Sequence, residues 1–222
     1  MLTSTTIKSI QDIMRQDVGV DGDAQRLAQL VWLIFLKILD DSDESLKIRN
    51  DKFIPTLPEK LRWSTWAAPM DGMTGDELIK FANDTLLPGL QTLPQNGNER
   101  TDLVRAAFNG VYNYMRKGTL LRQVVNKVSE IDFNKSEERH HFNEIYERLL
   151  RQLQAAKNYG ELYTPRALTQ FIVQMIDPQL GEQILDPAAG TGGFLVHTLE
   201  HLREQVKTPK DEKLVQKSIH GV

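Results

Sequence analysis

One stretch, residues 183–194, constrains the fold of this chain more than any other. Ile184 and Leu185 form a short apolar run, which suits a buried parallel strand. Asp186 ends the run, and Pro187 cannot donate a hydrogen bond to a sheet, so the strand should stop there. Small residues follow, and then apolar residues recur at helical spacing. The sequence therefore predicts a buried parallel strand, a tight glycine-rich loop and a helix, in that order.

The loop suits a ligand that is held by backbone groups. Gly190, Gly192 and Gly193 surround Thr191, and the absence of side chains lets N–H groups approach a ligand at the start of the helix. No lysine follows as a P-loop requires, and the glycine spacing does not fit a dinucleotide fingerprint. With Asp186 before it, the loop is similar to the cofactor loop of S-adenosylmethionine-dependent DNA methyltransferases. An ordinary glycine-rich turn is the alternative reading.

A second motif, residues 160–166, lies upstream and reads Gly-Glu-Leu-Tyr-Thr-Pro-Arg. Thr164 suits an N-cap and Pro165 the first helical position, so the sequence predicts a helix over residues 165–176. The apolar stripe of that helix is expected at Ala167, Leu168, Phe171, Ile172, Met175 and Ile176. The two motifs in this order resemble the modification (methyltransferase) subunit of type I restriction-modification systems. In that family's class of adenine methyltransferases, a catalytic Asn-Pro-Pro-Phe tetrad follows both motifs.

The resemblance implies the N-terminal fragment of a DNA adenine-N6 methyltransferase subunit that uses S-adenosylmethionine. It assigns cofactor binding to Glu161, Leu162, Tyr163, Thr164, Pro165, Arg166, Asp186, Gly190, Thr191, Gly192 and Gly193. Asn-Pro-Pro occurs nowhere in the sequence, and the acidic residue expected just after Val222 to hold the cofactor's ribose is missing too. No catalytic residue is therefore assigned, and we expect this chain alone to be inactive. The expected partners are DNA, a specificity subunit and a restriction subunit.

Composition narrows the class of protein. The chain has 27 Lys and Arg residues and 30 Asp and Glu residues, which gives a net charge of -3. A protein that binds DNA without a partner is usually basic, so this charge does not indicate such a protein. DNA contact would need a local patch or a partner. The chain has no cysteine, which excludes disulfides and thiolate metal sites. No apolar run approaches the roughly 20 residues of a membrane span, and the N-terminus lacks the basic-then-apolar pattern of a secretory signal, so we expect no membrane contact and a cytoplasmic location.

The order of patterns predicts two domains and a mainly α fold class. Residues 1–155 show several segments with helical spacing, separated by irregular stretches, and are expected to form an all-α helical N-terminal domain. Residues 156–222 are expected to be the beginning of a truncated S-adenosylmethionine-dependent methyltransferase domain, the first part of an α/β Rossmann-like core. Residues 27–39 are predicted as a central helix that ends in solvent at residues 40–44. A second strand is expected at residues 218–222.

Three further local predictions concern the helical part. Trp63 and Trp66 are expected to anchor an irregular stretch against the core. Residues 74–77 read Thr-Gly-Asp-Glu, which predicts a capping box at a helix start. Residues 142–157 are predicted as another helix.

Two clusters of polar residues have both a functional and a structural reading. The basic residues Arg116, Lys117, Arg122 and Lys127 would make a phosphate-facing patch for DNA, or only a solvated face. His197, Glu200 and His201 match the spacing of one group of zinc peptidases. The apolar residues around these three define a buried helix face that turns them outward, so we assign no metal ligand.

Two other functions stay open from the sequence alone. The glycine-rich loop gives no information about the substrate, so a methyltransferase acting on RNA, protein or a small molecule is one alternative. A non-catalytic interaction module, with the helical domain as a docking platform, is the other. The Thr-Pro motif favours DNA over RNA, protein or a small molecule as the substrate. The intact glycine-rich loop is evidence against a non-catalytic module.

Overall fold

The structure, a computed structural model, describes residues 4–95, 98–134, 164, 166–190 and 192–222 of the 222-residue chain. The chain divides into two compact units, Met1–Asn158 and Tyr159–Val222, which we call the helical unit and the α/β unit. No helix among the described residues is both long enough and apolar enough to cross a membrane.

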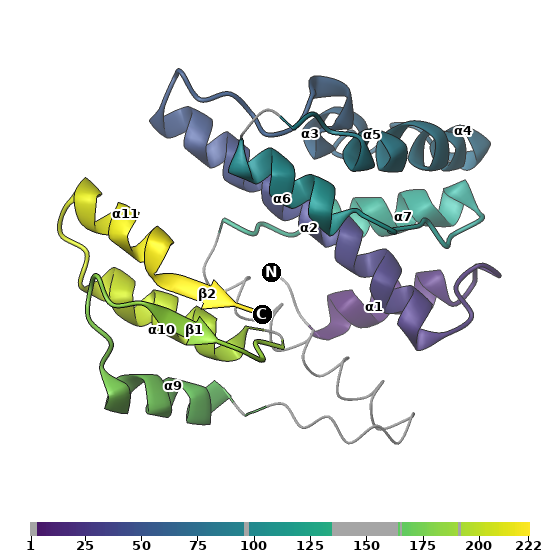
Figure 1. Cartoon of the computed structure of the whole chain (residues 1–222). Coiled ribbons are helices and arrows are strands. Elements are labelled where there is room, and N and C mark those ends of the chain that lie inside the picture. Colours follow the sequence, from purple (N-terminus) through teal and green to yellow (C-terminus); the bar gives the residue numbers. More distant parts are fainter. Residues whose placement is uncertain (1–3, 96–97, 135–163, 165, 191) are drawn as a thin grey trace. The chain divides into compact units, whose positions relative to one another are not determined.

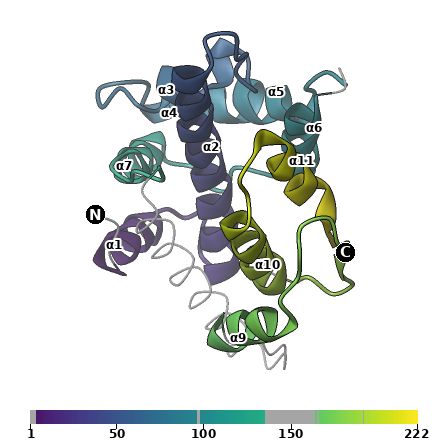
Figure 2. The same ribbon diagram turned by 90° about the vertical axis from the view of Figure 1, so that its left-hand side faces the viewer.

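The described part of the helical unit contains helices and no strand, as the mainly α prediction requires. Its long helix α2 contacts α3 and α7, and α7 also contacts α1 and α4 (Figures 1 and 2). The elements are α1 (Ser4–Met14), α2 (Asp23–Arg49), the 3-10 turn η1 (Glu59–Leu61), α3 (Trp63–Trp66), α4 (Gly75–Phe81), the π-helical turn η2 (Ala82–Leu86), α5 (Leu87–Gln91), α6 (Glu99–Ala107) and α7 (Gly118–Ser129).

Helix α2 is central, as the sequence predicts, but its predicted end is wrong. The helix continues past residues 40–44 to Arg49, and Asp40, Asp41 and Asp43 are buried. Each carboxylate has a partner, which offsets the loss of water. Asp40 accepts the backbone N–H of Ser64 (2.9 Å), Asp43 accepts that of Thr56 (2.5 Å) and also binds Arg100 (2.6 Å), and Asp41 pairs with Lys37. Asp43 therefore holds the segment after α2 and Asp40 holds α3, whereas Asp41 pairs within α2, and all three are withdrawn from solvent.

The tryptophan prediction is confirmed. Trp63 and Trp66 are almost fully buried, and their rings meet edge to face with centroids 5.2 Å apart. The Trp63 indole Nε1 donates to Ser129 Oγ at 3.1 Å, which links α3 to the end of α7. The rings thereby anchor the irregular stretch that joins α2 to α4.

The start of α4 is where the sequence places it, but the capping box is wrong. The helix begins at Gly75, and the side chain of Thr74 makes no hydrogen bond to the helix start within the described structure. Gly75 has φ +58°, a left-handed conformation, so the backbone turns sharply where a capping box needs an ordinary helical first turn. Residues 142–157, predicted as a helix, lie outside the described residues.

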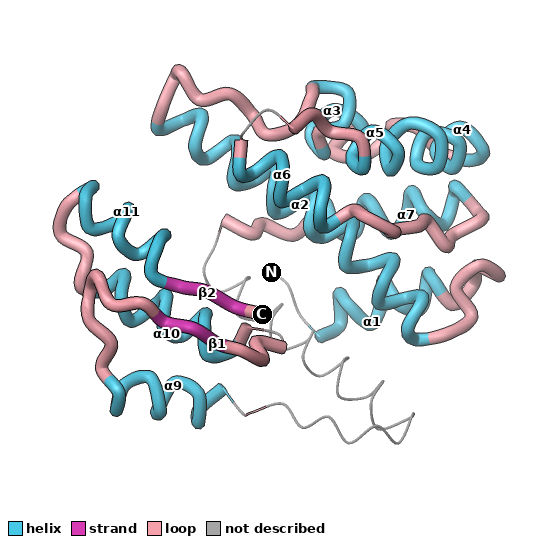
Figure 3. Tube along the Cα trace, viewed as in Figure 1, coloured by secondary structure: helices cyan, strands magenta, loops and turns pink. Residues whose placement is uncertain are grey.

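The described part of the α/β unit has two short parallel strands beside three helices (Figure 3). Ile184 pairs with Ile219 and Asp186 with Gly221, so both the parallel strand and the second strand are confirmed. Helix α11 was not predicted, although Thr208-Pro209 repeats the Thr-Pro start signal and Thr208 Oγ1 accepts the N–H of Asp211. The elements are α9 (Arg166–Ile176), β1 (Ile184–Asp186), α10 (Gly193–Glu204), α11 (Pro209–Ser218) and β2 (Ile219–Gly221).

The predicted burial of this unit is wrong in two places. Leu185 is 63% exposed and Ile184 is only half-buried. On α9 the buried residues are Thr169 and Val173, whereas much of the predicted apolar stripe is open. The exposed members of the stripe are Ala167, Leu168, Phe171, Met175 and Ile176. A strand points successive side chains to opposite faces, and a two-stranded sheet in the described residues gives β1 too few neighbours to cover both.

Candidate cofactor site at the end of the parallel strands

The glycine-rich loop leaves the sheet where both strands end. The N–H of Val222 donates to the carbonyl of Asp186 at 3.0 Å, and the N–H of Ala189 donates to the carbonyl of Val222 at 3.1 Å. A Cβ added to Gly221 would lie 2.6 Å from the Leu195 side chain, so β2 passes this loop and helix too closely for a larger residue. The loop is therefore fixed at the carboxyl ends of the strands, where open α/β sheets bind ligands.

Asp186 shapes the first part of the loop. Its Oδ1 accepts the N–H of Ala188 at 3.1 Å, a local bond that turns the chain after the strand. The residue is only half-buried, and a carboxylate has room for several hydrogen bonds. Asp186 can therefore both hold the turn and accept from a ligand donor.

Two glycines of the loop have backbone conformations that other residues rarely adopt, so glycine is needed at these positions. Gly190 has φ +54° and Gly192 has φ +76°, both in the left-handed region. The N–H of Gly192 donates to Ala189 at 2.7 Å, and α10 begins directly afterwards at Gly193. The first N–H groups of a helix have no partner within it, so they are available to a carboxylate at the loop. Thr191 lies outside the described residues.

The upstream motif is only partly described. Thr164 is exposed, and Arg166 is the first residue of α9 and half-buried. The helix predicted for residues 165–176 is thus confirmed over 166–176. Four assigned residues, Glu161, Leu162, Tyr163 and Pro165, lie outside the described residues, and their cofactor role stays a prediction.

Helices α9 and α10 run in the same direction, so both helices begin at the same end of the unit. Near their starts, Thr169 Oγ1 lies 2.8 Å from His197 Nδ1. Further along, Asp177 Oδ1 lies 2.9 Å from His201 Nε2. Later residues of one helix thus meet later residues of the other, so both helices begin at the same end (Figure 1). The first turn of α9, which follows the Thr-Pro motif in the sequence, therefore lies at the same end of the α/β unit as the start of α10.

These contacts also show what the predicted outward-facing cluster does. His197 binds a buried threonine and His201 binds Asp177, so neither imidazole is a simple solvated group, whereas Glu200 is exposed. Among the described residues no three His, Asp or Glu side chains are grouped to hold a metal ion. The sequence analysis missed Thr169 and His197 as parts of the site, because no local pattern marks a bond between separate helices.

An apolar cavity of about 260 Å³ lies between α9, β1 and α10. Its walls are aliphatic and aromatic except for Asp186 and Thr198. Such a lining suits an apolar group rather than a charged one. The polar groups of the site are instead those of the loop and of the start of α10.

The basic cluster does not form one surface. Arg122 is 5% exposed, and its guanidinium donates to the carbonyls of Trp66 (3.3 Å) and Ala67 (3.0 Å). Burial lowers the pKa of Arg122, as expected for a cation withdrawn from water. The prediction that Arg122 faces phosphate is wrong, because the residue anchors the tryptophan helix α3. Arg116 and Lys117 are exposed, and Lys127 pairs with Glu130 at 3.0 Å.

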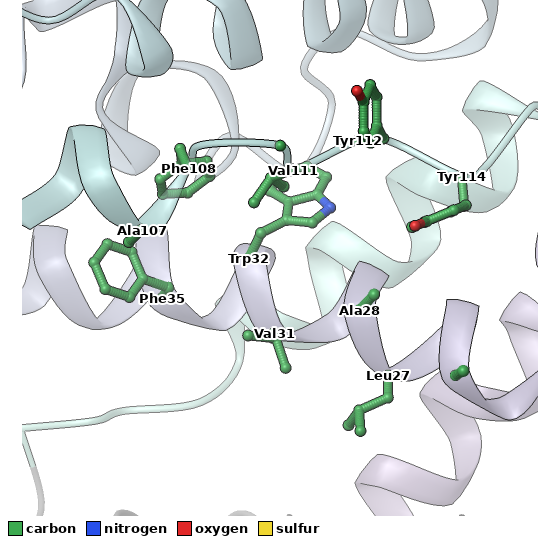
Figure 4. A pocket seen from close by; sticks show the side chains of 12 residues that line it. Leu27, Ala28, Val31, Trp32, Phe35, Ala107, Phe108, Val111, Tyr112 and Tyr114 are labelled. Atoms are coloured by element: carbon green, nitrogen blue, oxygen red, sulfur yellow. The ribbon is translucent and has the colours of Figure 1, made fainter. Parts of the chain in front are cut away.

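The helical unit has an apolar cavity of its own, of about 420 Å³, between α2 and the segment after α6 (Figure 4). Trp32 and Phe35 of α2 face Phe108 and Val111 across it, and Tyr112 lies at its rim, largely exposed. The cavity contains none of the residues assigned to the cofactor.

Two protein-family models match successive parts of the chain. Residues 3–128 match the HsdM N-terminal domain family, and residues 137–222 match the N-6 DNA Methylase family. The chain is 54% identical over its full length to the methylase subunit of the type I restriction enzyme EcoEI from Escherichia coli, of which it covers 46%.

Two solved structures are similar as well. The modification subunit of a putative type I restriction enzyme from Vibrio vulnificus YJ016 is 44% identical, with a TM-score of 0.87 over 98% of this chain and 49% of that one. A chain from a study of complex assembly and conformational transition of the type I R-M system is 32% identical, with a TM-score of 0.75 over 98% of this chain and 45% of that one. The chain spans about half the length of these relatives, and it belongs to the family of HsdM-type methylase subunits of type I restriction enzymes.

Proposed function

We propose that this chain supplies the S-adenosylmethionine site of a DNA adenine-N6 methyltransferase subunit that works in the cytoplasm. The observation that carries the proposal is the parallel pairing of α9 and α10. It places the start of both helices beside the glycine-rich loop at the end of β1. This shared end of the two helices supports one cofactor site made from both sequence motifs.

The residues present fit the chemistry of that cofactor. S-adenosylmethionine has an amino group and a carboxylate, and its sulfonium supplies the methyl group that is transferred. The open N–H groups at the start of α10 would bind the carboxylate, as helix N-termini bind anions. Asp186 would accept from the cofactor's donor groups while Ala188 holds its other contact. Gly190 and Gly192 would let the backbone approach closely.

The proposed reaction needs residues that this sequence does not contain. The target adenine is expected to leave the DNA helix and enter a pocket beside an Asn-Pro-Pro-Phe tetrad, which is absent from the sequence. In the proposed enzyme, this chain binds and orients the cofactor, and other residues hold the amino group of the adenine. The partners we propose are DNA, a specificity subunit and a restriction subunit.

A methyl-transfer assay with labelled S-adenosylmethionine tests this function. It compares this chain with a methylase subunit that carries the chain together with the remainder of the methyltransferase domain, each with the specificity subunit and unmethylated DNA. We expect transfer to adenine by the longer subunit, its loss in Asp186→Asn, and no transfer by the 222-residue chain alone. Transfer at an unchanged rate by Asp186→Asn would contradict the role of Asp186 in the cofactor site. No transfer by the longer subunit would instead support the role of a docking platform without a cofactor site.

A further inference from the structure

We propose that the hydrogen bond between Thr169 and His197 is a positioning contact that fixes the spacing of the two cofactor segments. The inference rests on the proposed function, because it concerns the same cofactor site. Thr169 Oγ1 and His197 Nδ1 are 2.8 Å apart, and neither residue belongs to a motif that predicts cofactor contact.

The location of Thr169 makes it the junction of the two segments. It lies in the first turn of α9, directly after the Thr-Pro motif, and is 1% exposed. A Cβ added to Gly193 would lie 3.8 Å from Thr169 Cγ2, so the first residue of α10 packs against the same side chain. His197 comes one turn later in α10. Thr169 therefore contacts the end of the glycine-rich loop through its methyl group and α10 through its hydroxyl.

The direction of the hydrogen bond follows from counting protons. Thr169 Oγ1 also lies 2.9 Å from the carbonyl oxygen of Arg166, which can only accept. A hydroxyl has one proton, so Thr169 donates it to Arg166 and must accept from His197. His197 Nδ1 therefore carries a proton. Both the neutral Nδ1–H tautomer and the imidazolium satisfy this requirement, so the contact persists in either charge state of the ring.

The hydrogen bond between Asp177 and His201 is less able to set the spacing of the two cofactor segments. The side chain of Asp177 is 66% exposed, so its pair with His201 is largely screened by water. That pair also lies at the far ends of the helices, away from both motifs. The buried Thr169–His197 bond at the motif end is the contact that defines how far apart the segments lie.

The geometric part can be tested without any cofactor. In the 222-residue chain labelled with ¹⁵N-histidine, NMR above the titration range of the ring should show His197 as the Nδ1–H tautomer. Thr169→Val removes the acceptor and should shift His197 toward Nε2–H, the form that free imidazole side chains prefer, whereas Thr169→Ser should not. A predominant Nε2–H form in the unaltered chain would overturn the inference, whatever the cofactor does.

The functional part uses a methylase subunit that carries this chain and the remainder of its domain. We expect Thr169→Val and His197→Leu to weaken S-adenosylmethionine binding about tenfold, because misplaced binding groups lose much of their interaction energy. Thr169→Ser and His197→Asn keep a hydroxyl acceptor or an N–H donor and should restore binding to within about twofold. Asp177→Asn, at the other end of the helix pair, is the matched control and should have little effect.

The outcomes separate this inference from the proposed function. Unchanged cofactor binding in Thr169→Val and His197→Leu, with wild-type binding intact, overturns the positioning role. Absence of binding in the wild-type subunit contradicts the proposed function instead. In that case the tautomer of His197 still decides whether the contact exists as described.

Discussion

The carboxylate of Asp17 accepts the backbone N–H groups of Arg116 at 3.0 Å and Lys117 at 2.8 Å, across 99 and 100 positions of sequence. Asp17 also accepts from Gly19 at 2.9 Å and is almost fully buried. It thereby ties the turn after α1 to the residues that precede α7. Two residues that the sequence analysis assigned to DNA thus also have a structural role, through their backbones rather than their side chains.

Asp17→Ala should lower the free energy of unfolding of the helical unit by about 3 kcal/mol, because it leaves buried N–H groups without an acceptor. Asp17→Asn should have a smaller effect, since its amide oxygen can still accept one bond. Urea unfolding followed by tryptophan fluorescence measures this, because all three tryptophans lie in this unit. Asp12→Asn, an exposed carboxylate of α1, is the control, and equal stability of Asp17→Ala and Asp12→Asn would contradict the prediction.

Trp63→Phe should be more destabilising than Trp66→Phe, by about 1 kcal/mol. Both rings are buried, but Trp63 Nε1 donates to Ser129, whereas Trp66 Nε1 has no hydrogen-bond partner among the described residues. The first substitution loses a hydrogen bond, and the second removes an unpaired donor. The same urea titration, followed by far-UV circular dichroism, ranks the two variants, and the reverse order would count against this assignment.

Asp40 should make the helical unit depend on pH. Burial raises its pKa above the ordinary value of 3.8, with a smaller contribution from Asp41. The stabilising effect of its protonation is therefore fully present below the unfolded pKa and is lost as pH rises through the folded pKa. Relative to Asp40→Asn, the wild-type chain should gain stability between pH 7 and about pH 4.5. If the difference in free energy of unfolding between wild type and Asp40→Asn stays constant with pH, or favours the variant at the lower pH, the charged form of Asp40 is not destabilised by burial.

The other three residues of the basic cluster should contribute to DNA binding through charge alone. Reversing Arg116, Lys117 and Lys127 in an assembled complex should weaken DNA binding and reduce the slope of log affinity against log salt, by up to about 0.9 per lost phosphate contact. Arg122→Met is the structural control, because it should lower stability by removing the donors to Trp66 and Ala67. An unchanged affinity and slope after the triple reversal would leave these residues as a solvated face.

Proline and glycine residues that end or turn the backbone locally explain why part of the fold could be predicted from the sequence. Pro187 ends β1, and the glycines around residue 191 fix the loop before α10, because each acts on its own stretch of backbone. The burial of Asp40 and Asp43 could not be predicted in this way. Their partners Ser64 and Arg100 come from distant segments, and an acidic run with no visible partner is typical of a solvated helix end.

The orientation of α9 could not be predicted for a similar reason. Its six apolar positions mark a stripe, but which side of a helix is buried depends on what packs against it. In the described structure α10 packs against the side with Thr169 and Val173, so a polar residue is the most buried one. The Thr169–His197 contact likewise arises only once the two helices lie side by side.

The central claim is that the loop from Asp186 to Gly193 binds S-adenosylmethionine, and equilibrium binding tests it most directly. Calorimetric titration would use a methylase subunit that carries this chain and the remainder of its domain, with wild type, Asp186→Asn and Glu204→Gln compared. Asp186→Asn can keep the bond to Ala188 but loses the charge and one acceptor oxygen, whereas Glu204 is an exposed carboxylate at the far end of α10. We predict at least tenfold weaker binding in Asp186→Asn, about 1.4 kcal/mol, and no change in Glu204→Gln. Equal affinity in all three proteins would contradict the account.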